Sequence, residues 1–304
     1  GENAANAMGH TVYDGSPLNR TTEAFAPGNS WAGTFNNATA GSRASTKIGY
    51  YTNTTADAVR IWDVTYPAAM GQWGNYSSSR TYNANTLYKN IVTDENGKQV
   101  IEFSDKQGKL ILKKVQLTAA ADDGSGAGYT GWLCTYYVYD NFGQLKAIIL
   151  PAAVKSMSGN STWTLSADML NEQCFRYEYD AHGRVIMKKS PGAGEVHMLY
   201  DAKSRLVAMQ DANMRDSSSR WLVTLYDNLD RPIETGFYNN ATAFSALLTQ
   251  VAAQTSFAPA IDELTETHYD SYDGLSATGL SANLAADWNA QFSATDNSNY
   301  PYPQ

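Results

Sequence analysis

The chain repeats one short phrase, and this repetition limits the possible folds more than any other feature of the sequence. The phrase places an aspartate after a strand-like stretch, a glycine or another turn-tolerant residue three positions later, and an aliphatic stretch after that. This spacing is typical of a type I turn, in which the Asp side chain accepts backbone N–H bonds and the Gly is left-handed. The aspartates of the copies are Asp94, Asp105, Asp140, Asp180, Asp201 and Asp227. A catalytic motif usually occurs once, so a phrase with this many copies indicates architecture.

Each aspartate closes a strand, most clearly in the copy YEYDAHGRVI at 177–186. Before Asp180, the residues Phe175, Tyr177 and Tyr179 alternate with polar residues, and this period of two predicts a strand with one buried aromatic face. The return strand begins at Val185, so each copy predicts a β-hairpin. One hairpin cannot bury its apolar face alone, so we expect successive hairpins to join into a long antiparallel sheet.

Tyr-Asp followed by Gly-Arg at these spacings resembles the YD repeat of the RHS family. The segment 177–184 (YEYDAHGR) is a close copy, and LYDAKSR and LYDNLDR follow the same pattern. The segments 16–31 and 91–103 are similar to the N-terminal region of large bacterial RHS-repeat proteins, and the resemblance covers most of residues 10–240. In that family, which includes toxin-complex components, polymorphic toxins and the teneurin adhesion proteins, the hairpins form a sheet that curls into a hollow spiral shell. The resemblance implies a mainly β fold: an antiparallel hairpin sheet curled into a partial barrel or spiral shell, with one or two short helices.

The resemblance also implies a structural function. We expect a non-enzymatic module that forms part of a β shell enclosing or presenting a C-terminal payload. The residues expected to build this wall are Tyr139, Asp140, Gly143, Tyr179, Asp180, Gly183, Arg184, Tyr200, Asp201, Arg205, Tyr226, Asp227 and Arg231. The resemblance to teneurins supports an alternative: a cell-surface binding or adhesion module that recognises a glycan or a protein.

The sequence departs from the family in one respect. RHS proteins that cleave themselves do so near an Asp-Pro-containing end of the core, and this chain has no Asp-Pro pair. The last residues, YPYPQ, resemble a linker. We therefore expect an N-terminal fragment of a longer protein, with its own C-terminal region as its partner.

Composition and patterning divide the chain into three segments. Residues 1–85 form a polar, turn-rich β region that contains the strand-like stretch DAVRIWDVTY, and residues 86–240 form the hairpin array. Residues 241–304 begin with a predicted helix at 241–254, whose apolar positions recur at helical spacing. SADMLNEQ, before Cys174, predicts a second short helix. Another Tyr-Asp pair follows at Tyr269 and Asp270, and from Leu275 we expect loose order.

Charge and hydropathy exclude several classes of partner. The net charge is −8, which does not provide the basic surface that a nucleic acid requires. The longest apolar run, LKAIILPAAV, is interrupted by Pro151 and is too short to span a bilayer. Polarity comes from Asn, Ser, Thr, Gly and Tyr, a mixture typical of extracellular β proteins. The first residues lack the basic and apolar regions of a signal peptide and look trimmed downstream of one, so we expect a secreted or cell-surface location.

Candidate catalytic and metal-binding residues are few. Glu178 and Asp180 lie two apart and could form a glycosidase pair, but Asp180 belongs to the repeated turn, so we expect no enzyme. The histidines have no metal-ligand spacing, and we expect no cofactor and no metal. They are His10, His182, His197 and His268. The glycine-rich stretch 122–131 lacks a phosphate-loop ending and is interpreted as a flexible loop, although Asp122 with Asp123 could help to hold calcium, as could Asp94 with Asn96.

Two further pairs leave alternatives open. Cys134 and Cys174 each lie six residues before a turn aspartate, so they could form a disulfide between equivalent strands or be two small buried hydrophobes. Exposed aromatic residues can stack on sugars. Among Trp31, Trp62 and Trp73, we favour Trp73 together with Tyr76 as an exposed ligand-binding pair, because glycine and serine surround them in GQWGNYSSS.

Overall fold

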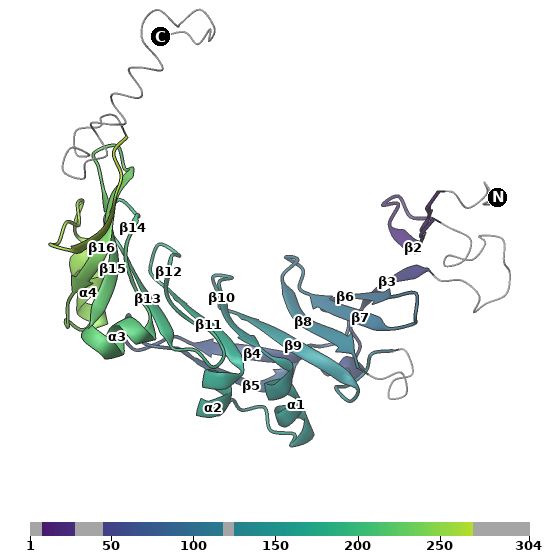
Figure 1. The fold of residues 1–304 in the computed structure, drawn as a ribbon. Helices are drawn as coiled ribbons and strands as arrows, with labels where there is room; N and C mark the ends of the chain where they lie inside the picture. Colours follow the sequence, from purple (N-terminus) through teal and green to yellow (C-terminus); the bar gives the residue numbers. More distant parts are fainter. Residues whose placement is uncertain (1–7, 28–44, 118–124, 270–304) are drawn as a thin grey trace, which may run out of the picture. The chain divides into compact units, whose positions relative to one another are not determined.

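The computed structural model describes residues 8–27, 45–117 and 125–269, and shows a mainly antiparallel β protein. The chain divides into two compact units, whose helices and strands are labelled in Figure 1. The first contains Gly1–Met198 with Asp211–Asn213, and the second contains Leu199–Gln210 with Met214–Gln304. The predicted fold class, a large sheet built from antiparallel hairpins, is confirmed. The division into segments 1–85, 86–240 and 241–304 stays a prediction.

The strands of the first unit pair antiparallel with their neighbours and follow the chain with one interruption. Their order is β1 (His10–Tyr13), β2 (Thr21–Phe25), β3 (Thr46–Thr52), β6 (Tyr88–Thr93), β7 (Gln99–Ser104), β8 (Leu110–Gln116), β9 (Trp132–Tyr139), β10 (Leu145–Ile149), β11 (Cys174–Tyr179), β12 (Val185–Lys189) and β13 (Glu195–Tyr200). The interruption is a separate two-stranded hairpin of β4 (Arg60–Thr65) and β5 (Asn75–Thr81), so the strand predicted in DAVRIWDVTY is confirmed.

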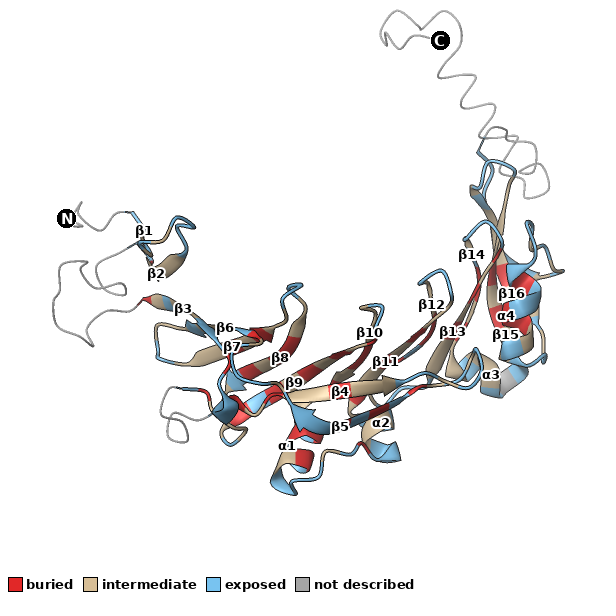
Figure 2. Cartoon of the chain, turned by 180° about the vertical axis from the view of Figure 1, so that it is seen from behind, coloured by how far each residue is buried: buried red, intermediate tan, exposed pale blue. Residues whose placement is uncertain are grey.

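The β4–β5 hairpin covers one face of the sheet (Figure 2). On that face β9 buries alternate residues, among them Tyr136 and Val138, as a half-buried strand requires. The backbone N–H of Arg60 donates to the Tyr136 hydroxyl oxygen at 2.8 Å, and the Tyr76 hydroxyl donates to the Lys146 carbonyl at 3.2 Å. The main hydrophobic core of this unit therefore lies between the central strands and a hairpin contributed by the polar N-terminal segment.

Several lysines are buried in this layer, and each has partners. Lys89 forms an ion pair with Asp57 at 2.7 Å, Lys146 forms one with Glu178, and Lys114 donates to the carbonyl oxygens of a neighbouring loop. A buried charge without such partners would cost several kcal/mol. The buried face is thus mixed in character, with charged groups interleaved with aromatic and aliphatic side chains.

Four α-helices occur in the described part of the chain, where the sequence predicted one or two. Helices α1 (Pro151–Gly159) and α2 (Ala167–Glu172) fill the connection between β10 and β11, and α2 confirms the helix predicted in SADMLNEQ. Helix α1 was missed because its sequence continues the apolar run of β10, although Pro151 at the first helical position is a start signal. Helix α3 (Ala212–Ser218) is short and was also missed.

The second unit contains β14 (Leu206–Gln210), β15 (Arg220–Tyr226), β16 (Pro232–Asn239) and β17 (Asp262–Glu266), paired antiparallel in that order. Helix α4 (Phe244–Ala252) confirms the helix predicted at 241–254 and buries Leu247, Leu248 and Val251. Its first residue, Phe244, stacks near Trp221 of β15 with ring centroids 6.2 Å apart. The helix thereby covers the apolar face of this small sheet.

Some predictions lie outside the described residues: those for Asp122, Asp123, Asp270 and the segment from Leu275 onward, and Trp31. Within the described ranges, no helix has the length and apolarity needed to cross a membrane.

Candidate functional site: the repeated Tyr-Asp turns

All six predicted turns have the same aspartate cap. At Asp180, the Oδ1 atom accepts bonds from the backbone N–H groups of His182 and Arg184, both at 2.9 Å, and the N–H of Gly183 donates to the Asp180 carbonyl at 3.0 Å. The same pair of side-chain bonds forms at Asp94, Asp105, Asp140, Asp201 and Asp227, with distances of 2.7 to 3.0 Å. The predicted cap is confirmed, and it explains why aspartate recurs at the end of each outgoing strand.

The residue three positions after each aspartate is left-handed. Gly143 and Gly183 have φ of 78° and 77°, and Ser204 and Asp230 have φ of 66° and 63° at the equivalent position. Glycine adopts this conformation freely, whereas an L side chain is strained there. The prediction of left-handed turn residues is confirmed in both the glycine and the non-glycine copies.

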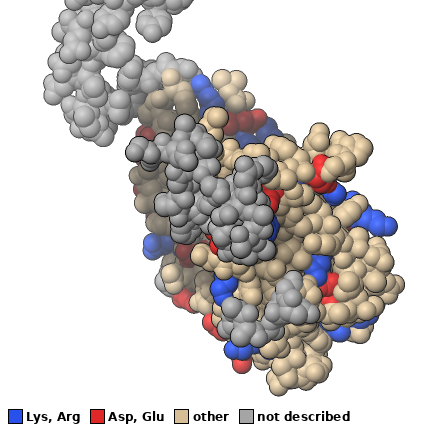
Figure 3. Space-filling view, turned by 90° about the vertical axis from the view of Figure 1, so that its right-hand side faces the viewer, with Lys and Arg blue, Asp and Glu red and all other residues tan. Residues whose placement is uncertain are grey.

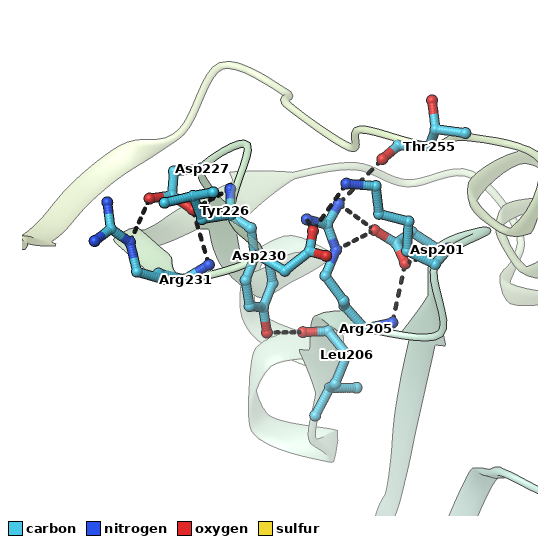
Figure 4. Close-up of polar contacts among 10 residues, drawn as sticks. Asp201, Arg205, Leu206, Tyr226, Asp227, Asp230, Arg231 and Thr255 are labelled. Carbon is cyan, nitrogen blue, oxygen red and sulfur yellow. Dashed lines mark hydrogen bonds and ion pairs between the residues drawn. The ribbon is translucent and has the colours of Figure 1, made fainter.

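The residue four positions after the aspartate adds a charge in the last three turns. Arg184 Nε contacts Asp180 Oδ2 at 2.6 Å, and Arg231 Nε contacts Asp227 Oδ2 at 2.7 Å. The backbone N–H of Arg231, followed by its side chain, holds the pKa of Asp227 below its usual value. Arg205 contacts Asp201 in the same way and also reaches Asp230 and the Thr255 carbonyl (Figure 4).

In several copies a tyrosine precedes the aspartate and contacts the hairpin before its own. The Tyr226 hydroxyl donates to the Leu206 carbonyl at 2.9 Å, while the Arg205 guanidinium lies 4.8 Å from the centre of the Tyr226 ring (Figure 4). Tyr269 repeats both contacts, with the Pro232 carbonyl at 2.8 Å and with Arg231 at 4.5 Å. The tyrosine and the basic residue therefore link neighbouring hairpins, while the aspartate closes its own turn.

This link recurs in the first unit, in two partial forms. The Tyr179 hydroxyl donates to the Leu145 carbonyl at 2.8 Å, and Lys109 Nζ lies 5.6 Å from the centre of the Tyr139 ring. Burial raises the pKa of Tyr179 to about 12, so its hydroxyl remains a donor at physiological pH. This role of the tyrosine was not predicted from the sequence, although a basic residue lies four positions after five of the six turn aspartates, all except Asp140, and was a visible signal.

Glu178 and Asp180, the candidate glycosidase pair, have separate structural partners. Glu178 is buried, forms an ion pair with Lys146 and accepts the Gly74 N–H at 2.9 Å, so it fastens the β4–β5 hairpin to the sheet. Asp180 caps its turn and binds Arg184. Both carboxylates are therefore engaged in the fold rather than directed at a common cavity.

The histidines do not come together. His182 is exposed in its turn, His197 is buried 3.4 Å from Glu195, and His268 lies 3.2 Å from Glu266. Among the residues that the structure describes, no group of three His, Cys, Asp or Glu side chains could hold a metal ion.

The predicted exposed pair, Trp73 and Tyr76, is corrected by the structure. Tyr76 is only 7% exposed, because β5 turns this residue toward the sheet, and burial raises its pKa to about 12. Trp73 is half-buried: its Nε1–H donates to Glu195 at 2.5 Å, and the Arg176 guanidinium lies 4.3 Å from its ring centre. The serines around the pair belong to β5, and the glycines belong to the segment that leads into it, rather than to an exposed loop.

The cysteines behave as buried hydrophobes. Cys134 on β9 and Cys174 on β11 are both free, and β10 separates their strands. Burial raises the pKa of Cys134 to about 11 and that of Cys174 to about 12. Of the two alternatives left by the sequence, the structure has the unbridged one.

Charged side chains of both signs are interspersed on the face shown in Figure 3, with no broad basic patch among the described residues visible there. This agrees with the net charge of −8.

Among known proteins, the chain is similar to several solved structures. No family model matches the sequence, and no curated protein matches it. A structure of the Photorhabdus luminescens Tc holotoxin pore is similar over 81% of this chain, at 15% identity and a TM-score of 0.42. Crystal structures of TcdB2-TccC3-TEV and TcdB2-TccC3 are similar over 81% of this chain, at 15% and 16% identity and TM-scores of 0.38 and 0.39. The chain spans about a tenth of the length of these proteins: 10%, 12% and 12% respectively.

Proposed function

We propose that this chain is a non-enzymatic structural module of an RHS-type protein, and that its hairpin sheet forms part of a wall that encloses or presents a C-terminal payload. The observation that carries the proposal is the link between hairpins. Tyr226 binds the carbonyl of the preceding hairpin, and the Arg205 that stacks on it also caps that hairpin's own turn. A motif used in this way joins each hairpin to the next, which a continuous wall requires.

The engagement of the polar groups supports a structural role. The turn aspartates accept two backbone N–H bonds each, and the buried Glu178 binds Lys146 and Gly74. A catalytic carboxylate needs an approach for substrate and a pKa suited to proton transfer. These carboxylates stabilise the fold instead, as expected of a scaffold. We propose that the module is secreted or displayed at a cell surface.

Limited proteolysis of the full-length protein, followed by mass spectrometry, tests the proposal. We expect a discrete fragment C-terminal to residue 304 that resists protease while the hairpin array is intact. In the double variant Tyr226→Ala/Arg205→Ala, which removes one link between hairpins, that fragment should become sensitive. Phe142→Ala is the matched control, because the Phe142 side chain is 82% exposed in a turn and its ring lies near Tyr66 rather than against a neighbouring Tyr-Asp turn.

If everything beyond residue 304 is digested while the array of the unaltered protein persists, the wall encloses nothing and the proposal fails. A fragment that resists protease equally in the double variant would show that its protection does not depend on the hairpin links.

A further inference from the structure

A cavity of about 680 Å³ lies over β3, β6 and β7, on the sheet face opposite the one that carries Lys89 and Phe103. Strand alternation places Tyr50 and Thr52 of β3 on this face, and the register places Asn90 and Tyr88 of β6 directly beside them. Ser104 of β7 pairs with Tyr88 from the other side. The cavity is therefore built on three consecutive strands whose relative positions are fixed by backbone hydrogen bonds.

Small neighbours leave one aromatic ring uncovered. Tyr88 is flanked across the strands by Thr52 and Ser104, whose short side chains cannot cover a ring, and it is 55% exposed. Gly108 also lines the cavity, and a Cβ added there would meet nothing within 4 Å. A ring that is half exposed and lines a cavity offers a stacking surface of about the width of a pyranose.

Polar groups beside this ring are available to a ligand. The side-chain amide of Asn90 and the hydroxyls of Ser104 and Tyr88 form no hydrogen bond within the part of the chain that the structure describes. An amide offers a donor pair and an acceptor, and a hydroxyl offers both roles. Donors and acceptors of this kind can bind two adjacent hydroxyls of a sugar whose ring stacks on a neighbouring aromatic side chain.

Arg20 closes one side of the cavity and adds a charge. Its Nε binds Asp14 at 2.8 Å and its guanidinium lies 4.6 Å from the centre of the Tyr50 ring, which fixes the group in place. The terminal nitrogens of Arg20 form no hydrogen bond with the described residues, so they can donate two parallel bonds to a carboxylate.

We propose that this cavity binds a saccharide, with Tyr88 stacking on a sugar ring, Asn90 and Ser104 bonding its hydroxyls, and Arg20 favouring sugars that carry a carboxylate. The site is distinct from Trp73 and Tyr76, where the sequence indicated a sugar-binding pair. It does not depend on the structural role proposed above: a wall could carry this site, and the site could exist on a sheet that encloses nothing.

Affinity electrophoresis on this chain tests the proposal, because a net charge of −8 drives the protein through a native gel at pH 8. Separate gels contain polygalacturonate, hyaluronan, dextran or mannan, and retardation against polymer concentration gives the dissociation constant. We expect retardation in at least one gel, strongest with a carboxylate-bearing polymer. Tyr88→Ala should weaken binding about tenfold through the lost stacking contact, and Asn90→Ala about three- to tenfold through the lost hydrogen bonds.

Two controls make the result specific. Tyr88→Phe keeps the stacking ring and should bind within about threefold of the unaltered chain, and Phe142→Ala removes an exposed aromatic ring outside the cavity and should change nothing. Absence of retardation in all four gels overturns the proposal. Retardation that persists unchanged in both Tyr88→Ala and Asn90→Ala overturns it as well.

Discussion

Replacement of Gly183 by valine should destabilise its hairpin by about 1–3 kcal/mol. Gly183 has φ of +77°, a conformation that costs an L residue roughly 1–2 kcal/mol, and a β-branched side chain is strained further there. The added Cβ would lie 3.3 Å from Gln144 Nε2. That atom is the end of a flexible side chain that can move, so backbone strain accounts for most of the cost.

Two other turns separate strain from crowding. Gly97 has φ of +80°, and a Cβ added there would meet nothing within 4 Å, so Gly97→Val should show the cost of backbone strain alone. Ser204 has φ of 66° and already carries that strain, so Ser204→Gly should leave stability unchanged or raise it by up to about 1 kcal/mol. The three changes together test whether one turn geometry governs all copies.

Hydrogen exchange read by mass spectrometry measures these effects hairpin by hairpin, because amide protection reports the free energy of local opening. We expect faster exchange in β11 and β12 of Gly183→Val, with β7 and β8 unaltered. Unchanged protection in Gly183→Val, or a loss of protection in Ser204→Gly, would refute the argument from the left-handed turn.

Three further changes test other contacts. Tyr226→Phe removes only the hydroxyl that reaches the preceding hairpin, and should lower the free energy of unfolding in urea by about 0.5–1.5 kcal/mol. Glu178→Gln leaves Lys146 buried without a carboxylate and should lower the free energy of unfolding by about 3–5 kcal/mol in the same assay. Glu102→Gln breaks an exposed ion pair and should lower it by about 0–1 kcal/mol. Equal effects of the two changes would contradict the burial of the Lys146–Glu178 ion pair. The Cys134 thiol, whose pKa burial raises to about 11, should react with a thiol reagent at pH 8 only after urea unfolding, and reaction in the native state would contradict its burial.

Local features of this fold were readable in the sequence because their causes are local. The cap at Asp180 involves only residues up to Arg184, and the left-handed position is marked by glycine in most copies. The outgoing strand is marked by alternation with a period of two, which the structure places in β11. Each of these features needs no information from distant parts of the chain.

The buried aromatic face predicted for this strand is wrong. Cys174, Arg176 and Glu178 are the buried residues of β11, whereas the aromatic residues between them are only partly buried. The cause is distant in sequence, because the segment that leads into β5 packs on this face: the Gly74 N–H donates to Glu178, and Trp73 lies against Arg176.

The features that could not be predicted from the sequence depend on distant residues. Tyr76 looked exposed beside glycine and serine, yet β5 lies on the sheet and its hydroxyl reaches the Lys146 carbonyl, 70 positions along the chain. The exposure of Tyr88 has the same kind of cause, since it depends on Thr52 and Ser104 lying across from it. Cross-strand register, which sets both outcomes, cannot be read from one strand.

The link between hairpins also gives the array a direction. Tyr226 needs the carbonyl of Leu206 and the guanidinium of Arg205, both supplied by the hairpin before it, while its neighbour Asp227 closes the turn of its own hairpin. In a Tyr-Asp pair, the tyrosine therefore binds the preceding hairpin and the aspartate binds its own turn. Because the two residues bind different groups, a hairpin placed in the opposite orientation would lose both contacts. This asymmetry favours a sheet that grows in one direction, with each hairpin positioned by the preceding one, as a wall built from a single chain requires.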